Sequence, residues 1–160
     1  MAIINKCCCF NNVRSGSYAS GIYTISYAFL GFIYFACNIV LTAHNSNENS
    51  YFISSIVGMI FWGLAFITAI FMMIGVYQDL KGMLIPYIIV KIFIILVQWI
   101  FLILYIIRLV RVFYWYYLTF SLLLVAIISI NIMCLLCVVS QYQELKAGRG
   151  TALDVSVPDQ

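Results

Sequence analysis

Residues 84–139 read LIPYIIVKIFIILVQWIFLILYIIRLVRVFYWYYLTFSLLLVAIISINIMCLLCVV, a run of 56 residues that is charged only at Lys91, Arg108 and Arg111. As one helix the run would be about 84 Å long, whereas a bilayer core of about 30 Å needs only about 20 apolar residues. The run therefore has to fold back, and the two arginines mark the turn. We expect two membrane spans, 84–107 and 113–139.

Two more apolar stretches lie upstream. Residues 20–43 are interrupted only by small residues, tyrosines and Asn38, and residues 52–77 carry no charge. Together the four stretches predict an all-α integral membrane protein, a four-helix transmembrane bundle with short loops. The chain then divides into an N-terminal segment (1–19), a transmembrane domain (20–139) and a tail (140–160) that we expect to be disordered.

The composition excludes most soluble classes of protein. Of the 160 residues, 66% are apolar and 8% are charged, and the mean hydropathy is +1.10. A soluble domain carries about a quarter charged residues. The net charge of +3 is too small and too scattered to indicate nucleic-acid binding. The expected partners are therefore the lipid bilayer and, laterally, other integral membrane proteins or a second copy of this chain.

The basic residues beside the spans predict the orientation, because cytoplasmic loops are enriched in Lys and Arg. The side that holds both termini and the loop 78–83 carries five of them, Lys6, Arg14, Lys81, Lys146 and Arg149. The opposite side carries Arg108 and Arg111, which argue the other way. The majority predicts cytoplasmic termini.

Lys91 is the one charge deep within a span, about 10 Å from the boundary at Leu84 by the helical rise. A lysine at this depth can extend its stem toward the interface, here toward Asp79 or a lipid phosphate. Alternatively, Asn131 lies at nearly the same depth in the last span, and a Lys91–Asn131 hydrogen bond would join the two spans.

A second polar layer is predicted nearer the opposite surface. Gln98 shares a helical face with Lys91, and Ser121 and Asn38 lie at a similar height on other spans. Such groups hold bundles together through interhelical hydrogen bonds, or else line a path for a small solute. The absence of acidic residues from the spans favours packing over a path. Small residues mark the expected packing faces, namely Ala28, Gly31, Ser54, Gly58, Ala65 and Ala69.

Five of the six cysteines, all except Cys37, fall into two groups. Cys7, Cys8 and Cys9 stand close to the first span on the predicted cytoplasmic side, which favours S-palmitoylation over unmodified thiols. Cys134 and Cys137 have the spacing of a redox or zinc pair, but they lie in an apolar span without a second pair nearby. We interpret them as packing residues and predict no metal site.

The tail contains Tyr142 and Leu145 at the spacing of a Tyr-x-x-apolar sorting signal. Because Tyr142 lies only three residues beyond the predicted span, an ordinary interfacial tyrosine is the alternative interpretation. The single histidine, His44, has no metal partners, and no nucleophile–base pattern or phosphate loop is present. We therefore predict no catalytic residues, no cofactor and no small-molecule substrate: the chain is not expected to be an enzyme.

Two segments carry a family resemblance. The stretch 7–23, CCCFNNVRSGSYASGIY, and the link 79–86, DLKGMLIP, resemble the small insect tetraspan proteins of the Pasiflora and Fire exit type. They are also similar to the related lysosome-associated four-span transmembrane family. The tail lacks the Pro-Pro-x-Tyr motifs of the lysosomal members, and their long loops are missing, so the compact chain resembles the insect proteins more.

The resemblance implies a plasma-membrane protein that helps to assemble septate-type cell junctions and barriers. The alternative is an endolysosomal trafficking or transport-accessory protein that acts through Tyr142 and Leu145. A transporter or channel is a third possibility, which the charge-poor spans disfavour.

Overall fold

A computed structural model describes residues 12–44, 49–111 and 114–148, and these residues form only helices and turns. Four long helices follow one another, α1 (Val13–His44), α2 (Asn49–Tyr77), α3 (Leu84–Arg111) and α4 (Trp115–Lys146), with a short 3₁₀ turn η1 (Lys81–Met83) before α3. Each of the four is long and apolar enough to cross a membrane. For the described residues, the prediction of an all-α fold with four such helices is confirmed.

The helices extend beyond the apolar stretches that predicted them. α1 begins at Val13 rather than at residue 20, and α4 continues to Lys146 rather than ending at residue 139. Residues 140–146 are thus helical, whereas we expected them to belong to a disordered tail. Hydropathy marks only the apolar part of a helix, and the backbone of α4 stops where Gly148 adopts a φ of 74°, a left-handed conformation typical of helix ends.

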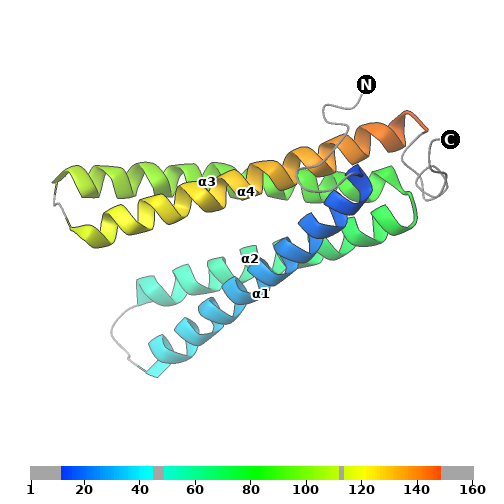
Figure 1. Ribbon diagram of the computed structural model, residues 1–160. Helices are drawn as coiled ribbons and strands as arrows, with labels where there is room; N and C mark the ends of the chain where they lie inside the picture. The colour runs from blue at the N-terminus through cyan, green and yellow to red at the C-terminus, as the bar shows by residue number, and fades with distance from the viewer. Residues whose placement is uncertain (1–11, 45–48, 112–113, 149–160) are drawn as a thin grey trace.

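The helices form two hairpins, α1–α2 and α3–α4, which pack together at one end and diverge at the other (Figure 1). The packed end holds the start of α1, the end of α4 and the link from α2 to α3. We call this half of the molecule the closed half, and the half toward the α1–α2 and α3–α4 connections the open half. The main apolar core lies in the closed half and consists of Ala69, Met72, Val76, Leu84, Tyr87, Val138 and Leu145.

Small residues bring α1 and α2 close together, as the sequence pattern predicted. Ala28 and Ala65 are fully buried in a second cluster with Ile94. Gly31 faces the indole of Trp62 so closely that an added Cβ would lie 2.6 Å from its Cδ2. Glycine is therefore required at residue 31 for the observed approach of the two helices.

An ion pair between Arg14 and Asp79 stabilises the closed half. Arg14, at the start of α1, donates from Nη1 to Asp79 Oδ1 at 2.8 Å and from Nη2 to the carbonyl of Tyr77 at 3.3 Å. Asp79 has a φ of 56° in the turn between α2 and η1. The pair therefore connects the N-terminal end of the first hairpin to the link that leads into the second.

Candidate functional site

Lys91 is buried inside the closed half, with 1% of its surface exposed. Its Nζ donates to Thr24 Oγ1 of α1 at 3.0 Å, and Thr24 Oγ1 lies 2.9 Å from the Tyr87 hydroxyl. The Thr24 hydroxyl donates to the carbonyl of Ser20 at 2.8 Å. Because a hydroxyl has one proton and two lone pairs, Tyr87 must donate to Thr24, whose lone pairs then accept from both Tyr87 and Lys91.

Aromatic rings complete the surroundings of Lys91. Its Nζ lies 5.3 Å from the centroid of the Tyr23 ring and 5.7 Å from that of Tyr87. Both distances allow a cation–π attraction, which is stronger where water is excluded. Within the described part of the chain Lys91 forms no ion pair. A hydroxyl and two ring faces therefore compensate its burial.

This arrangement differs from both sequence-based expectations for Lys91. The side chain bonds to Thr24 rather than to Asp79, which pairs with Arg14. The hydrogen bond to Asn131 is not formed either. The depth match was wrong, because α4 continues to Lys146 rather than ending at residue 139, and Asn131 bonds to Gln98, seven residues along α3 from Lys91. Lys91 itself faces α1 rather than α4.

Asn131 and Gln98 form the polar contact between α3 and α4. Asn131 Nδ2 donates to Gln98 Oε1 at 2.9 Å, and the two residues are 0% and 7% exposed. Asn131 Oδ1 is buried and has no hydrogen-bond partner within the described part of the chain. The pair joins the two helices of the second hairpin near its middle.

The other two members of the predicted outer layer do not join Gln98. Asn38 Nδ2 donates to the carbonyl of Tyr34 at 2.8 Å, and Ser121 Oγ donates to that of Leu118 at 2.9 Å. Each side chain thus bonds to the preceding turn of its own helix, which is the usual local alternative for short polar side chains. Gln98, Asn38 and Ser121 therefore form no common layer.

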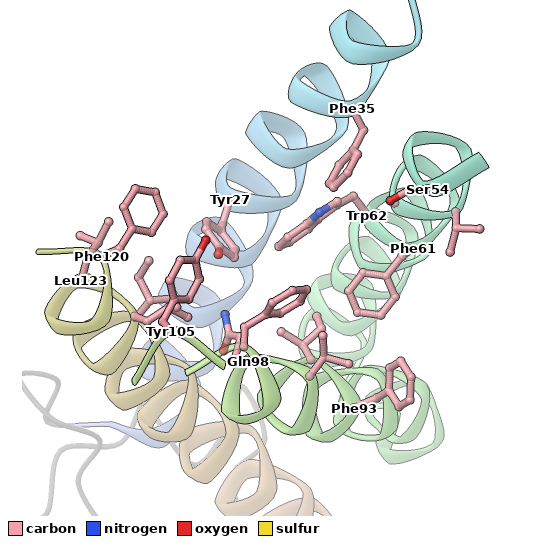
Figure 2. A pocket seen from close by; sticks show the side chains of 17 residues that line it. Tyr27, Phe35, Ser54, Phe61, Trp62, Phe93, Gln98, Tyr105, Phe120 and Leu123 are labelled. Atoms are coloured by element: carbon pink, nitrogen blue, oxygen red, sulfur yellow. The ribbon is translucent and has the colours of Figure 1, made fainter. Parts of the chain in front are cut away.

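A pocket of about 610 Å³ opens in the region where the hairpins diverge. All four helices contribute to it, and its side chains converge from the two hairpins (Figure 2). Its lining is largely aromatic and aliphatic, with Tyr27, Phe35, Ser54, Val57, Gly58, Phe61, Trp62, Phe93, Ile94, Val97, Gln98, Phe101, Tyr105, Phe120, Leu123, Leu124 and Ile127.

Aromatic pairs hold the walls of this pocket in place. The Tyr27 and Trp62 rings meet edge to face with centroids 4.9 Å apart, which joins α1 to α2. Tyr105 and Phe120 stack at 5.5 Å and join α3 to α4. Aromatic contacts of this kind stabilise a fold by more than the burial of their apolar area alone. Each hairpin thus presents a preformed aromatic face to the pocket.

The remaining predicted site residues lie elsewhere. Cys7, Cys8 and Cys9 fall outside the described residues. Cys134 is a free, buried thiol, and no group of three metal-ligating side chains occurs in the described part of the chain. Tyr142 lies in the last turns of α4, packed against the core, and Leu145 is 9% exposed. The sorting motif is thus part of a packed helix.

Nothing in the sequence indicated that Lys91 would contact Thr24, Tyr87 and Tyr23. Threonine and tyrosine are common in membrane helices, and no spacing rule connects residues on different spans. The pocket was also missed, because it arises from the angle between the hairpins.

The chain matches no known family model, no curated protein and no solved structure.

Proposed function

We propose that this chain is a non-catalytic four-span membrane protein that acts by lateral helix packing, as a structural and assembly component of septate-type cell junctions. The proposal rests on the observation that the buried polar side chains form hydrogen bonds with one another inside the bundle. Lys91 and Tyr87 both bond to Thr24, Gln98 bonds to Asn131, and all five side chains lie within the bundle. This supports a bundle held together by polar contacts over one that conducts a solute.

The outward face of α4 offers a surface for lateral packing. Leu122, Ala126, Ser129 and Met133 are exposed and follow one another at spacings of four, three and four residues, so they lie on one helical face. Ser129 bonds to the carbonyl of Val125 in its own helix. Small residues between larger apolar ones allow another membrane helix to approach closely. We propose this face as the contact with a neighbouring membrane protein.

The alternative, endolysosomal trafficking through Tyr142 and Leu145, receives less support. A sorting receptor that reads Tyr142 and Leu145 needs both side chains accessible, and Leu145 is buried in the core of the closed half. Trafficking by this motif therefore requires the last turns of α4 to detach from the bundle.

The location of the protein decides between the two proposals. The endogenously tagged protein should form a continuous lateral belt with junction markers in a polarised epithelium. Punctate signal that coincides with lysosomal markers would instead overturn the junction proposal. In the same cells Ala126→Leu should reduce copurification of membrane partners, whereas Val40→Leu, at an exposed residue of α1, should not.

The proposed orientation places both termini in the cytoplasm. A reporter at residue 160 should then be inaccessible from outside intact cells, and accessibility would show that the orientation is reversed. The same orientation makes Cys7, Cys8 and Cys9 available to cytoplasmic acyltransferases. Hydroxylamine-sensitive acyl exchange should give a mass shift that disappears when all three are changed to Ser.

A further inference from the structure

The pocket between the hairpins has the dimensions of a small-molecule site. Its volume of about 610 Å³ falls within the range of about 300–1,000 Å³ typical of ligand pockets. Two of its lining residues on α3, Phe93 and Tyr105, are twelve residues apart, about 18 Å along the helix axis. The space is therefore elongated and extends along the helices.

Gln98 supplies a polar group to this pocket, between the levels of Phe93 and Tyr105 on α3. Gln98 is nine-tenths buried, and its Oε1 already accepts from Asn131. Its amide group points into the pocket, where the Tyr27 hydroxyl faces the same side chain (Figure 2). An amide N–H is a donor, and a phenol both donates and accepts. Together they can bind one oxygen function of a ligand that is otherwise apolar.

The aromatic walls favour a rigid ligand over a flexible one. Phe61 and Phe93 meet at 5.7 Å across the α2–α3 contact, and Tyr27 and Trp62 meet at 4.9 Å across the α1–α2 contact. A fused-ring molecule can lie against such walls with almost no loss of internal freedom. An acyl chain loses the freedom of many rotatable bonds on binding, which reduces its affinity.

From this geometry we infer that the pocket binds a sterol. The ring system lies between the aromatic faces of the two hairpins, and the hydroxyl group bonds to Gln98 and Tyr27. A sterol supplies the three properties that the pocket requires, namely a rigid apolar body, an elongated shape and a single hydroxyl. Since the hairpins diverge in the open half, the ligand enters laterally from the bilayer. This inference is independent of the cell structure that the protein serves.

The adjacent leucines Leu122 and Leu123 of α4 provide a matched test. Both are exposed, by 64% and 54%, but only Leu123 lines the pocket. The purified full chain, in phosphatidylcholine nanodiscs, is photolabelled with a cholesterol analogue that carries a diazirine and an alkyne. We expect labelling of pocket residues that unlabelled cholesterol displaces. Leu123→Trp should weaken labelling at least about fivefold through overpacking, whereas Leu122→Trp should leave it unchanged.

The polar anchor is tested from the ligand side, which leaves the fold untouched. Cholesteryl methyl ether lacks the hydroxyl proton and should compete about two- to tenfold less well than cholesterol, as expected for one lost hydrogen bond. Equal competition by the two sterols would contradict the role of Gln98 and Tyr27.

Three further results would overturn the sterol assignment. One is labelling that persists unchanged in Leu123→Trp. Another is pocket labelling by a phosphatidylcholine with a diazirine in its acyl chain that cholesterol does not displace, which would make acyl chains the occupant. The third is cross-linking of the pocket to a second copy of the chain, which would make it a helix-docking site.

Discussion

The close contact between Gly31 and Trp62 makes a quantitative prediction about stability. An added Cβ at residue 31 would lie 2.6 Å from Cδ2, 2.7 Å from Cε2 and 2.9 Å from Cγ of the indole. The Cγ atom of Trp62 is bonded directly to Cβ, so rotation of the ring about the Cβ–Cγ bond does not move Cγ and cannot relieve its overlap with the added Cβ. Gly63, on α2, is the matched control, because an added Cβ there meets nothing within 4 Å.

The two changes to alanine should therefore have different effects. In each variant the higher helix propensity of alanine over glycine adds about 1 kcal/mol to the free energy of unfolding. Gly31→Ala also incurs an overpacking cost of about 1–3 kcal/mol, whereas Gly63→Ala does not. We expect Gly63→Ala to stabilise the protein by up to about 1 kcal/mol. Gly31→Ala should be less stable than Gly63→Ala by about 1–3 kcal/mol.

The assay is equilibrium unfolding of the purified chain in mixed micelles with increasing dodecyl sulfate, followed by circular dichroism. Because both variants are glycine-to-alanine changes within helices, the propensity contribution largely cancels in the comparison. If Gly31→Ala is as stable as Gly63→Ala, the close approach of α1 and α2 at Trp62 is wrong, and with it the aromatic wall of the pocket.

Three other contacts give predictions of their own. Thr24→Val should lower the free energy of unfolding by about 1.5–3 kcal/mol in the same assay, because Lys91 loses its hydrogen-bond acceptor. Adding Lys91→Met to Thr24→Val should restore most of this stability. If Thr24→Val leaves the stability unchanged, the hydrogen bonds around Lys91 are wrong. Asp79→Asn keeps a residue type that tolerates positive φ but removes the ion pair with Arg14. It should lower the free energy of unfolding by at most about 1 kcal/mol, and by less at high salt. An equal loss of stability in 1 M salt would show that the pairing is not electrostatic. Tyr142→Ala should leave the steady-state location of the protein unchanged, and its redistribution between membranes would favour the sorting motif.

The four helices could be predicted because the length and apolarity of the runs leave no other structure that satisfies the backbone in lipid. The start of α1 and the end of α4 could not be predicted from the sequence. Charged and polar residues such as Arg14 and Glu144 continue α1 and α4 beyond the apolar region, and a backbone feature at Gly148 ends α4. Hydropathy contains no information about either.

The polar residues within the bundle were predicted individually, but their partners were not. Lys91, Asn131 and Gln98 are all buried and hydrogen-bonded. The register of α4 against α3 could not be counted from the sequence, because the apolar run ends at residue 139 whereas α4 continues to Lys146. The rotation of each helix about its axis depends on packing across the whole bundle. That rotation turns Lys91 toward Thr24. The pocket depends in addition on the angle between the hairpins.

The divergence of the two hairpins has a consequence for a surrounding bilayer. The bundle is narrow at its closed half and broad at its open half (Figure 1), so across a membrane it would displace different areas of lipid in the two leaflets. Such a wedge fits best where one leaflet is stretched relative to the other, as in a curved membrane. An occupant between the hairpins would set how far they separate, so lipid composition would act on the shape of the wedge and, through it, on the curvature that the protein prefers.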